Sequence, residues 1–451
     1  MRMPTTPAIP ACLIAAFAFC AAACGADSDP PGADSAAQVM PQYQVRDSGG
    51  IRIIENDRPG EGSRLGWRIG PDPALTIGSV QGEDAWQFHL VDDALKLGDG
   101  RIVVANGGAH QLLVFDGEGD HLATWGQKGE GPGDFGGARG GDAYGTRLFW
   151  AEPWPGDSIA VCHGTYSLGL ELLSVFDLEG RHARTVNLAR DAANARCRDV
   201  LRNGSIIASR SLQEWSGYPP TGIHRYDMDF SLLAGDGSVL AELGSRPGAE
   251  EFYYLDESEF PPVSFWMHNP PFQQTVVWSA WGDLAIVSPT DRYEIRAYGT
   301  DGSVMRVVRR DQAARTPTEE DLEAFRTEYV APVEDPELRE LLNTVAAALP
   351  LPPAFPAFAA IEVDALGYLW VREYDPPGDD RPLWTVFDPE GIVQGFVETP
   401  PGLVIYEIGA DYILGKVRDE LRVEYVQLWP LDRSGVQAVA GSTPTNGSSR
   451  S

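Results

Sequence analysis

The sequence predicts an all-β fold, a six-bladed β-propeller of four-stranded antiparallel blades with a helical insertion near residues 316–349. Three observations carry this prediction. The 451 residues include 49 Gly and 35 Pro, an excess of turn-forming residues that favours many short strands over a few long helices. Hydrophobic residues make up 43% of the chain, which is enough to build a large core. A tight turn closed by Gly recurs along the chain, which indicates a structural repeat.

The clearest repeat unit is a run of short apolar segments separated by turns. Segments of this length, rich in β-branched residues and joined by tight turns, predict an antiparallel meander. The unit comprises a turn and three apolar segments, at residues 99–100, 101–105, 111–116 and 121–125.

The turn that closes this unit returns four more times. The intervals between its closing glycines are 61, 57, 65 and 89 residues, and the last is long because it contains the predicted helical insertion. A meander cannot bury both of its faces alone, so repeated units stack side by side, and a ring leaves only short edges exposed. The closing glycines are Gly119, Gly180, Gly237, Gly302 and Gly391.

The two ends of the repeat region each hold an incomplete unit. Near the carboxyl end, residues 404–408, 412–417 and 421–428 provide three strands without a fourth. Near the amino end, residues 43–55 contain an Ile-rich strand that has no unit of its own. We expect this segment to complete the last blade and to close the ring non-covalently, which gives six blades.

Residues 316–349 read as two helices. Thr318 offers a hydroxyl cap, and the acidic residues that follow it suit the positive end of the helix dipole. Leu322, Phe325 and Tyr329 then fall on one helical face, and a second helix follows Pro336. The insertion is either an ornament packed on one blade or a lid over the mouth of the ring.

The amino end has the pattern of an export signal. Residues 1–23 contain an apolar segment that is short for a membrane span but suits a signal peptide. They end in Ala-Ala-Ala before Cys24, which resembles the lipobox of bacterial lipoproteins and implies that Cys24 is acylated. Cleavage of an ordinary secretory signal nearby is the alternative. Residues 24–42 predict a flexible tether, and residues 434–451 a disordered tail.

Two cysteines remain in the predicted propeller, residues 43–433. The other three lie in the signal segment or at the lipobox. A pair in an oxidising compartment can form a disulfide, so we expect Cys162 and Cys197 to be bonded; two separate buried thiols are the alternative. Their spacing is not that of a zinc site.

One region resembles a known family. Residues 97–135 combine an Asp-Gly turn, an Ile-Val-Val-Ala strand, a Val-Phe-Asp-x-x-Gly turn and a Gly-x-x-Gly-x-Gly-Pro-Gly-Asp-Phe exit. This pattern is similar to an NHL-type β-propeller repeat, and the whole chain resembles exported bacterial six-bladed β-propellers. The resemblance implies a fold; such propellers include binding scaffolds as well as lactonase-like and lyase enzymes. The resemblance to lactonase-like propellers also allows one cofactor, a divalent metal ion in the central channel. Apart from this ion, we expect no cofactor.

Two aromatic loop regions are candidates for a recognition surface, although aromatic residues also pack under their own loops. The candidate binding residues are Trp215, Tyr218, Phe265, Trp266 and His268. The seven His residues are scattered and show no metal-ligand spacing, no nucleophile elbow is present, and acidic pairs such as Asp92-Asp93 read as solvated charge. Catalytic residues and metal ligands therefore have no assignment from sequence.

The charge of the chain excludes two classes of partner. Asp and Glu number 65 against 35 Lys and Arg, a formal net charge of −30. Nucleic acids and anionic membrane surfaces both require a basic face.

The leading hypothesis is an exported, lipid-anchored monomer of the cell envelope, periplasmic or in the outer membrane, that binds a small molecule or an envelope protein and is not an enzyme. A metal-dependent hydrolase or lactonase and a purely structural component are the alternatives. Acidic side chains that converge in the channel would favour the enzyme; an apolar channel mouth would favour binding.

Overall fold

The computed structural model describes residues 42–81, 84–136, 146–165, 170–188, 195–213, 218–258, 262–313, 315–375 and 382–434. All of them belong to one compact unit, Met40–Ser451, and a separate unit, Met1–Val39, lies outside them. The predicted signal peptide, Cys24 and the predicted tail after residue 434 are therefore outside the described residues. Among the described residues, no helix is both long and apolar enough to cross a membrane.

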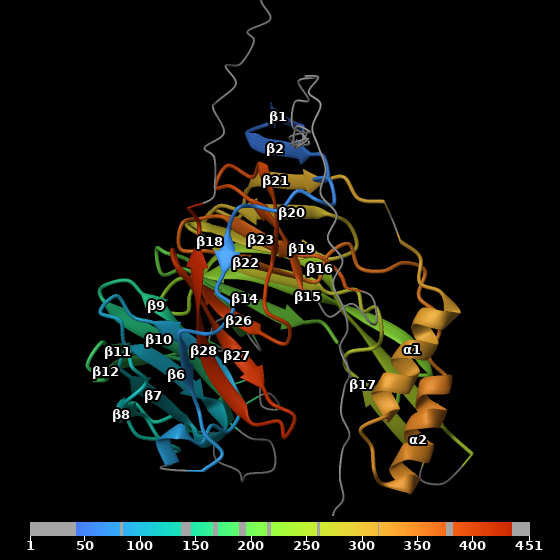
Figure 1. Cartoon of the computed structure of the whole chain (residues 1–451), viewed down its shortest axis with the longest axis horizontal. Coiled ribbons are helices and arrows are strands. Elements are labelled where there is room, and N and C mark those ends of the chain that lie inside the picture. The colour runs from blue at the N-terminus through green and yellow to red at the C-terminus, as the bar shows by residue number, and fades with distance from the viewer. Residues whose placement is uncertain are drawn as a thin grey trace, which may run out of the picture. The chain divides into compact units, whose positions relative to one another are not determined.

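The described residues are mostly strand and form six sheets, which we number I to VI in chain order (Figure 1). The expectation of a mostly-β chain containing four-stranded antiparallel sheets is confirmed. Sheet I contains β5 (Val91–Lys96), β6 (Ile102–Asn106), β7 (Gln111–Phe115) and β8 (His121–Trp125). Sheet II contains β9 (Thr146–Trp154), β10 (Ser158–Thr165), β11 (Leu170–Asp177) and β12 (His182–Asn187). Sheet V contains β22 (Ala360–Val363), β23 (Leu369–Arg372), β24 (Leu383–Phe387) and β25 (Val393–Glu398).

The other three sheets have additional strands. Sheet III contains β13 (Arg196–Val200), β14 (Ile206–Ser211), β15 (Gly222–Leu233), β16 (Val239–Asp256) and β17 (Val263–Met267). Sheet IV contains β18 (Val276–Trp281), β19 (Leu284–Pro289), β20 (Glu294–Tyr298) and β21 (Val304–Arg310), extended by β2 (Ile51–Asn56) and β1 (Tyr43–Ser48). Sheet VI contains β26 (Val404–Ile408), β27 (Tyr412–Arg418) and β28 (Glu424–Asp432), completed by β3 (Arg68–Ile69) and β4 (Leu75–Ile77). Two short 3-10 helices are η1 (Asp84–Trp86) and η2 (Gly107–Ala109).

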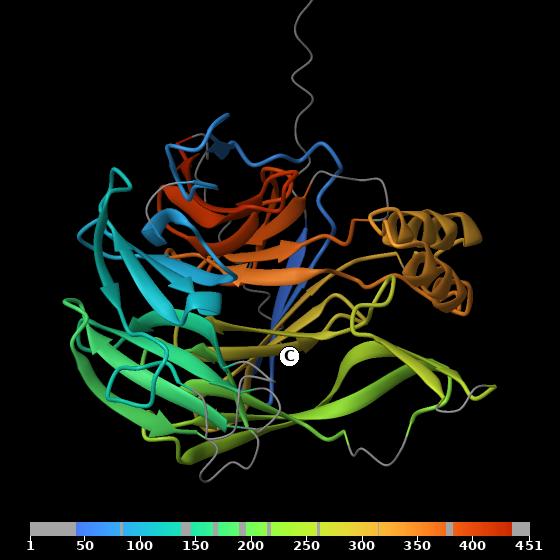
Figure 2. The same ribbon diagram turned by 90° about the horizontal axis from the view of Figure 1, so that it is seen from below.

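The core of the molecule lies between the sheets. Six apolar clusters each join two consecutive sheets, and the sixth, which contains Phe115 of sheet I and Leu414 of sheet VI, joins the last sheet back to the first. The first strands of the sheets also contact one another in the same order. The six sheets therefore succeed one another in a closed cycle (Figure 2).

The five predicted closing glycines all adopt positive φ angles, between 79° and 92°. All five also lie against the preceding sheet of the cycle, and two of them come closest to its side chains. A Cβ atom on Gly180 would come 2.2 Å from the Trp125 ring of sheet I, and one on Gly391 would come 2.7 Å from Val308 of sheet IV. Gly thus recurs at these turns for two reasons, a left-handed backbone and close packing of the next sheet.

The predicted closure of the ring is wrong in its details. Strand β2 pairs in parallel with β21 and so extends sheet IV instead of completing the last sheet. The short strands β3 and β4 complete sheet VI, with Ile77 paired to Val426 of β28. The reason is burial: Ile54 of β2 is fully buried in the cluster between sheets IV and V, where its side chain fits the edge of β21.

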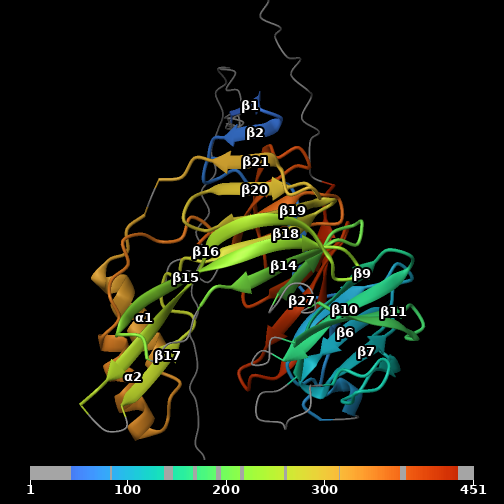
Figure 3. The same cartoon turned by 180° about the vertical axis from the view of Figure 1, so that it is seen from behind.

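The helical insertion forms where the sequence predicts it. Helix α1 (Glu319–Val330) begins with a capping box between Thr318 and Asp321, and α2 (Pro336–Ala347) follows. An apolar cluster packs the two helices on the extended ends of β16 and β17 (Figure 3). This packing favours the interpretation that the insertion is an ornament on sheet III.

The side chain of Asn56 links sheets IV and V through hydrogen bonds, and its removal should destabilise the fold. Its buried amide donates to the carbonyl oxygens of Arg309 (3.0 Å) and Gly391 (3.1 Å), and its oxygen accepts from the N–H of Val393 (2.9 Å). Asn56→Ala leaves three buried backbone groups unpaired and should lower the free energy of unfolding by roughly 2–4 kcal/mol, measured by urea denaturation.

The matched control is Asn343→Ala on the exposed face of α2, which should change the free energy of unfolding by less than about 0.5 kcal/mol. Equal stabilities of the two variants would contradict the role assigned to Asn56.

Candidate functional site

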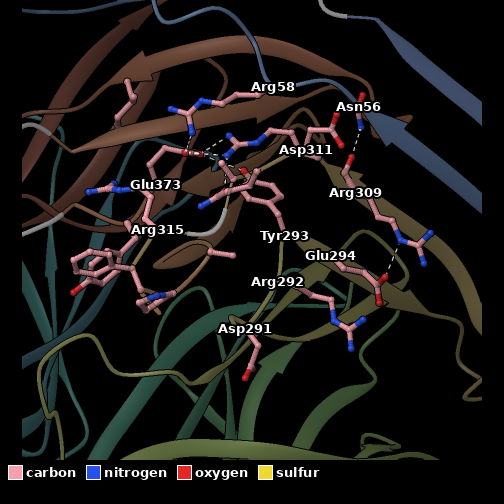
Figure 4. Close-up of a pocket in the computed structure, with 18 of the residues that line it drawn as sticks. Asn56, Arg58, Asp291, Arg292, Tyr293, Glu294, Arg309, Asp311, Arg315 and Glu373 are labelled. Atoms are coloured by element: carbon pink, nitrogen blue, oxygen red, sulfur yellow. Dashed lines mark hydrogen bonds and ion pairs between the residues drawn. The ribbon is translucent and has the colours of Figure 1, made fainter. Parts of the chain in front are cut away.

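A cavity with a volume of about 1270 Å³ lies where sheets IV and V meet (Figure 4). The end of β2, the turn before β20, the end of β21 and the segment after β23 supply its walls. The segments on either side of the helical insertion, around Arg315 and Phe355, complete it. Six arginines line this cavity: Arg58, Arg64, Arg292, Arg309, Arg310 and Arg315.

Arg310 fixes the floor of the cavity. Its side chain is fully buried and binds both carboxylate oxygens of Glu373, at 2.6 and 3.0 Å. It also donates to the hydroxyl of Thr385 (2.6 Å) and lies 3.8 Å from the centre of the Tyr293 ring. A buried charge is tolerated when it is paired and hydrogen-bonded in this way, so Arg310 and Glu373 form a rigid structural pair.

Three further arginines of the cavity are also paired with protein carboxylates. Arg309 binds Glu294 (2.7 Å) and Glu55 (3.0 Å). Arg64 binds Glu398, and Arg58 lies 3.3 Å from a carboxylate oxygen of Glu373. Carboxylates of the protein therefore pair with these arginines as well. The net positive potential of these groups is therefore largely cancelled within the cavity.

Arg292 and Arg315 are different. Among the described residues, neither guanidinium forms an ion pair or a side-chain hydrogen bond, although Arg315 lies 5.2 Å from the centre of the Phe355 ring. Both are exposed and both line the cavity (Figure 4). The same lining contains seven carboxylates, and two of these, Glu61 and Asp311, likewise form no ion pair with a described residue.

Aromatic rings lie between the charged groups of the cavity. Their apolar faces can hold the hydrocarbon or ring portion of a ligand, while guanidinium groups orient an acidic group through charge-assisted hydrogen bonds. Such a site has the chemistry to bind an organic anion. The aromatic residues of the lining are Tyr293, Phe355, Tyr374 and Phe396.

The centre of the cycle holds a second group of charged residues. Five acidic side chains lie on the first strands of five sheets, and four of them line a cavity of about 430 Å³ together with Ser279 of β18. Sequence analysis read Asp93 as solvated charge, but its side chain is buried. The reason is that β5, which looks like one strand among many in sequence, lies at the centre of the cycle. The five acidic residues are Asp93, Glu152, Asp199, Glu362 and Glu407.

Three of these carboxylates bridge consecutive sheets. Asp93 accepts from the N–H of Ala151 on β9 (2.9 Å), and Asp199 accepts from the N–H of Ala280 on β18 (2.7 Å). Glu407 in the same way accepts from the N–H of Lys96 on β5 (2.7 Å). Each strand has a bulge immediately before its acid, which turns the carboxylate towards the neighbouring sheet.

The central carboxyls hold protons more tightly than ordinary acids. Burial, followed by repulsion from Glu407 and Asp199, raises the pKa of Asp93 to about 8, and burial raises the pKa of Asp199 to about 6. Burial and then repulsion from Asp93 and Asp199 raise the pKa values of Glu152 and Glu362 as well. Among the described residues, neither Glu152 nor Glu362 forms a hydrogen bond or an ion pair that relieves this repulsion.

A metal ion does not fit the central acids as they are arranged. Within the part of the chain that the structure describes, no three of these carboxylates bring a ligand atom each within 4.8 Å of one another. The group of side chains that meets this condition consists of Cys162, Glu171 and Cys197. The two oxygens of Asp93 and of Asp199 also already accept backbone N–H groups.

The predicted cysteine pair comes together across the boundary of sheets II and III. Cys162 lies on β10 and Cys197 on β13, their Cα atoms are 6.6 Å apart, and their sulfur atoms lie at bonding distance. Both side chains are buried in the cluster between the two sheets. The redox state of the pair in the native protein stays a prediction.

The structure brings two of the predicted aromatic binding residues together, Trp266 and His268. Trp215 lies outside the described residues, and Tyr218 is exposed. Phe265 packs with the apolar cluster of the helices. On the opposite face of β17, Trp266 stacks on Tyr253 (5.4 Å between ring centres) and lies tilted against His268 (3.9 Å). None of the described members lines the large cavity.

Sequence reasoning missed the residues of that cavity. They come from the end of one sheet, the end of its neighbour and both flanks of the insertion, so no linear motif connects them. The only available signal was the rarity of basic residues, which makes the Arg-rich segments around Arg292 and Arg309 stand out in an acidic chain.

Comparison with known proteins identifies similar structures but no family. No protein-family model matches the chain, and no curated protein matches its sequence. Similar solved structures include a protein of Bacteroides fragilis NCTC 9343 described as exported (12% identity, TM-score 0.45, 84% of this chain and 99% of the other). They also include a DUF4221 member from Bacteroides vulgatus (9%, 0.42, 81% and 98%) and virginiamycin B lyase from Staphylococcus aureus (10%, 0.35, 81% and 99%). At these TM-scores we draw no conclusion from them, and the NHL-type resemblance stays an expectation.

The central acids should make stability depend on pH. Their folded-state pKa values lie above the value of about 4 expected for unfolded carboxyls, so their stabilising contribution is complete below that pH and is lost as pH rises through the folded pKa values. We therefore expect the free energy of unfolding to fall between pH 5 and pH 8. Glu152→Gln removes one repelling charge and should raise stability at pH 8 by roughly 1 kcal/mol, with little effect at pH 5.

Urea denaturation at both pH values measures these effects, and Glu257→Gln, at an exposed loop position, is the matched control. A Glu152→Gln variant that is no more stable than the control at pH 8 would show that the central acids do not repel one another.

Proposed function

We propose that this chain is an exported, lipid-anchored protein of the bacterial cell envelope that binds a small organic anion in the cavity between sheets IV and V. The observation that carries this proposal is that Arg292 and Arg315 form no ion pair with a described residue, in a cavity whose other arginines are paired with carboxylates of the protein. The carboxylate or phosphate of a ligand would take the place of the missing counter-ions. On this proposal the protein acts as a binding scaffold and not as an enzyme.

We also propose that the six sheets are the blades of a six-bladed propeller. The closed cycle of apolar clusters supports this assignment, as do the contacts between consecutive first strands. Strands β3 and β4 would close the ring by pairing residues near the amino end with β28. The NHL-type repeat around residues 97–135 would then be the first blade.

The aromatic lining narrows the class of ligand. Tyr293 and Phe355 each already lie beside a guanidinium group, at 3.8 Å from Arg310 and 5.2 Å from Arg315. A ligand with an aromatic or hydrocarbon portion next to its acidic group would therefore contact both the aromatic rings and the guanidinium groups of the cavity. A fully hydrophilic polyanion would leave the aromatic rings uncovered.

The alternative enzyme would use the centre of the cycle instead. Acidic residues from five sheets meet there, which is the feature we expected of a metal-dependent hydrolase or lactonase. A divalent metal ion at that place belongs to this alternative. It is the weaker candidate because three of the acids bind backbone N–H groups of the next sheet and so have a structural role. A purely structural envelope component is the third candidate and predicts no ligand.

Anion binding should depend on the two unpaired arginines. Isothermal titration with benzoate, phenyl phosphate, malate and citrate should identify at least one ligand among the aromatic anions. Arg292→Ala and Arg315→Ala should each weaken its binding roughly tenfold to a hundredfold, because each removes a charge-assisted hydrogen bond.

The matched control is Arg202→Ala, which removes another exposed arginine, at the turn between β13 and β14. This variant should bind as the unchanged protein does. Binding that survives in the Arg292→Ala, Arg315→Ala double variant would refute the site, and saturable binding of a divalent cation that Glu152→Gln abolishes would favour the enzyme.

Anchoring should depend on Cys24. In the native host, the mass of the mature amino-terminal peptide should match a chain that begins at an acylated Cys24, and Cys24→Ser should release the protein from the membrane fraction, since stable anchoring needs the acyl chains. An unmodified amino terminus, or one that begins after Cys24, would contradict the lipoprotein assignment and leave plain secretion.

A further inference from the structure

Cys162 and Cys197 share their site with a third side chain, the carboxyl of Glu171. One ligand atom from each of the three residues lies within 4.8 Å of the others, and the Glu171 carboxylate oxygen Oε2 is 4.0 Å from the Cys162 sulfur. The residues come from β10, β11 and β13, so the cluster spans the boundary of sheets II and III. All three are buried, with exposed fractions of 0%, 4% and 4%.

The Glu171 carboxyl is held in place by the backbone. Its Oε2 atom accepts the N–H of Cys197, which fixes the carboxyl beside that sulfur. Glu171 therefore links sheets II and III in the way that Asp93, Asp199 and Glu407 link other consecutive sheets. The same hydrogen bond places a carboxyl oxygen beside both sulfur atoms.

Together, the two sulfur atoms and the Glu171 carboxyl form a set of metal-binding donor atoms. Two thiolates and one carboxylate are ligands that Zn²⁺ and Cd²⁺ favour, and the usual fourth position is taken by water when a site opens on a cavity. The central cavity reaches Glu171 and Cys197, so water has access to the cluster. A metal ion can bind there only when the sulfur atoms are not joined to each other.

We propose that Cys162, Glu171 and Cys197 form a redox-gated site for a thiophilic divalent cation. In the oxidised chain the disulfide closes the site. A dithiol reductant opens it: two electrons and two protons pass to the disulfide, which becomes two thiols, while the reductant becomes a disulfide. The two thiols then release their protons to solvent as the cation binds both sulfurs and Glu171.

The consequence is a cross-link between sheets II and III in either state. The disulfide provides it under oxidising conditions, and the metal ion provides it after reduction. Only the reduced, metal-free chain would lose the link, and the two sheets would then be joined here by apolar packing and by the hydrogen bonds of Cys197 with Glu171 and Trp150.

Cadmium binding tests the proposal, because a Cd²⁺–thiolate bond has an ultraviolet charge-transfer band. Every arm uses the full chain with Cys12, Cys20 and Cys24 replaced by Ser, so that Cys162 and Cys197 are the remaining cysteines. The reduced protein, desalted without oxygen, should show the band and saturate at about one equivalent of Cd²⁺, with Zn²⁺ competing. The oxidised protein should show no band.

Variants separate the three ligands. Cys162→Ser should abolish saturable binding, and Glu171→Gln should keep the band but weaken the affinity roughly tenfold or more. Glu250→Gln, at a half-buried carboxyl elsewhere in sheet III, is the matched control and should bind as the parent does. Circular dichroism establishes that each variant is folded.

Two results would overturn the proposal. One is a reduced parent protein that shows no saturable band. The other is an affinity that Glu171→Gln leaves unchanged, since the carboxylate would then not be a ligand. The Glu171→Gln comparison keeps the test decisive even if Cys162→Ser fails to fold.

Discussion

Each sheet of this protein must bury both of its faces, and it does so against the sheets before and after it in the cycle. This constraint sets the rest of the structure. It requires glycine where the closing turn of one sheet meets a side chain of the sheet before, as Gly180 meets Trp125. It also requires the last sheet to pair with a strand that precedes the first sheet in the chain, as β28 pairs with β4. Carboxylates such as Asp93 then tie the inner strands together where side chains alone leave backbone N–H groups unpaired.

The cavity follows from an addition to this cycle. Strand β2 extends sheet IV beyond its four strands, and its end at Asn56 brings a further segment of chain over the boundary with sheet V. The connections to the helical insertion enclose the same boundary from the other side. Charged residues of both signs gather at this boundary and many of them are paired, and Arg292 and Arg315 are the arginines of the lining that form no ion pair with a described residue.

Much of the fold is visible in sequence because the repeat is local. The strand at residues 121–125 has the predicted bounds, and Gly119 closes a tight turn as predicted, since both depend on residues close in the chain. The pairing of β2 is not predictable in this way, because the edge of sheet IV and the edge of sheet VI offer equally good partners to an Ile-rich strand. Strand β4 has only three residues, too few for any pattern. The charged cavity is not visible either, because its residues meet only after the sheets have packed.

A crystal structure of the protein with its tightest-binding aromatic anion is the most direct test of the proposed binding site. The predicted result is electron density for the acidic group within hydrogen-bond distance of Arg292 and Arg315, with the ring of the ligand against Phe355. Density for the anion at the centre of the cycle, or none in the cavity at saturating ligand concentration, would contradict it.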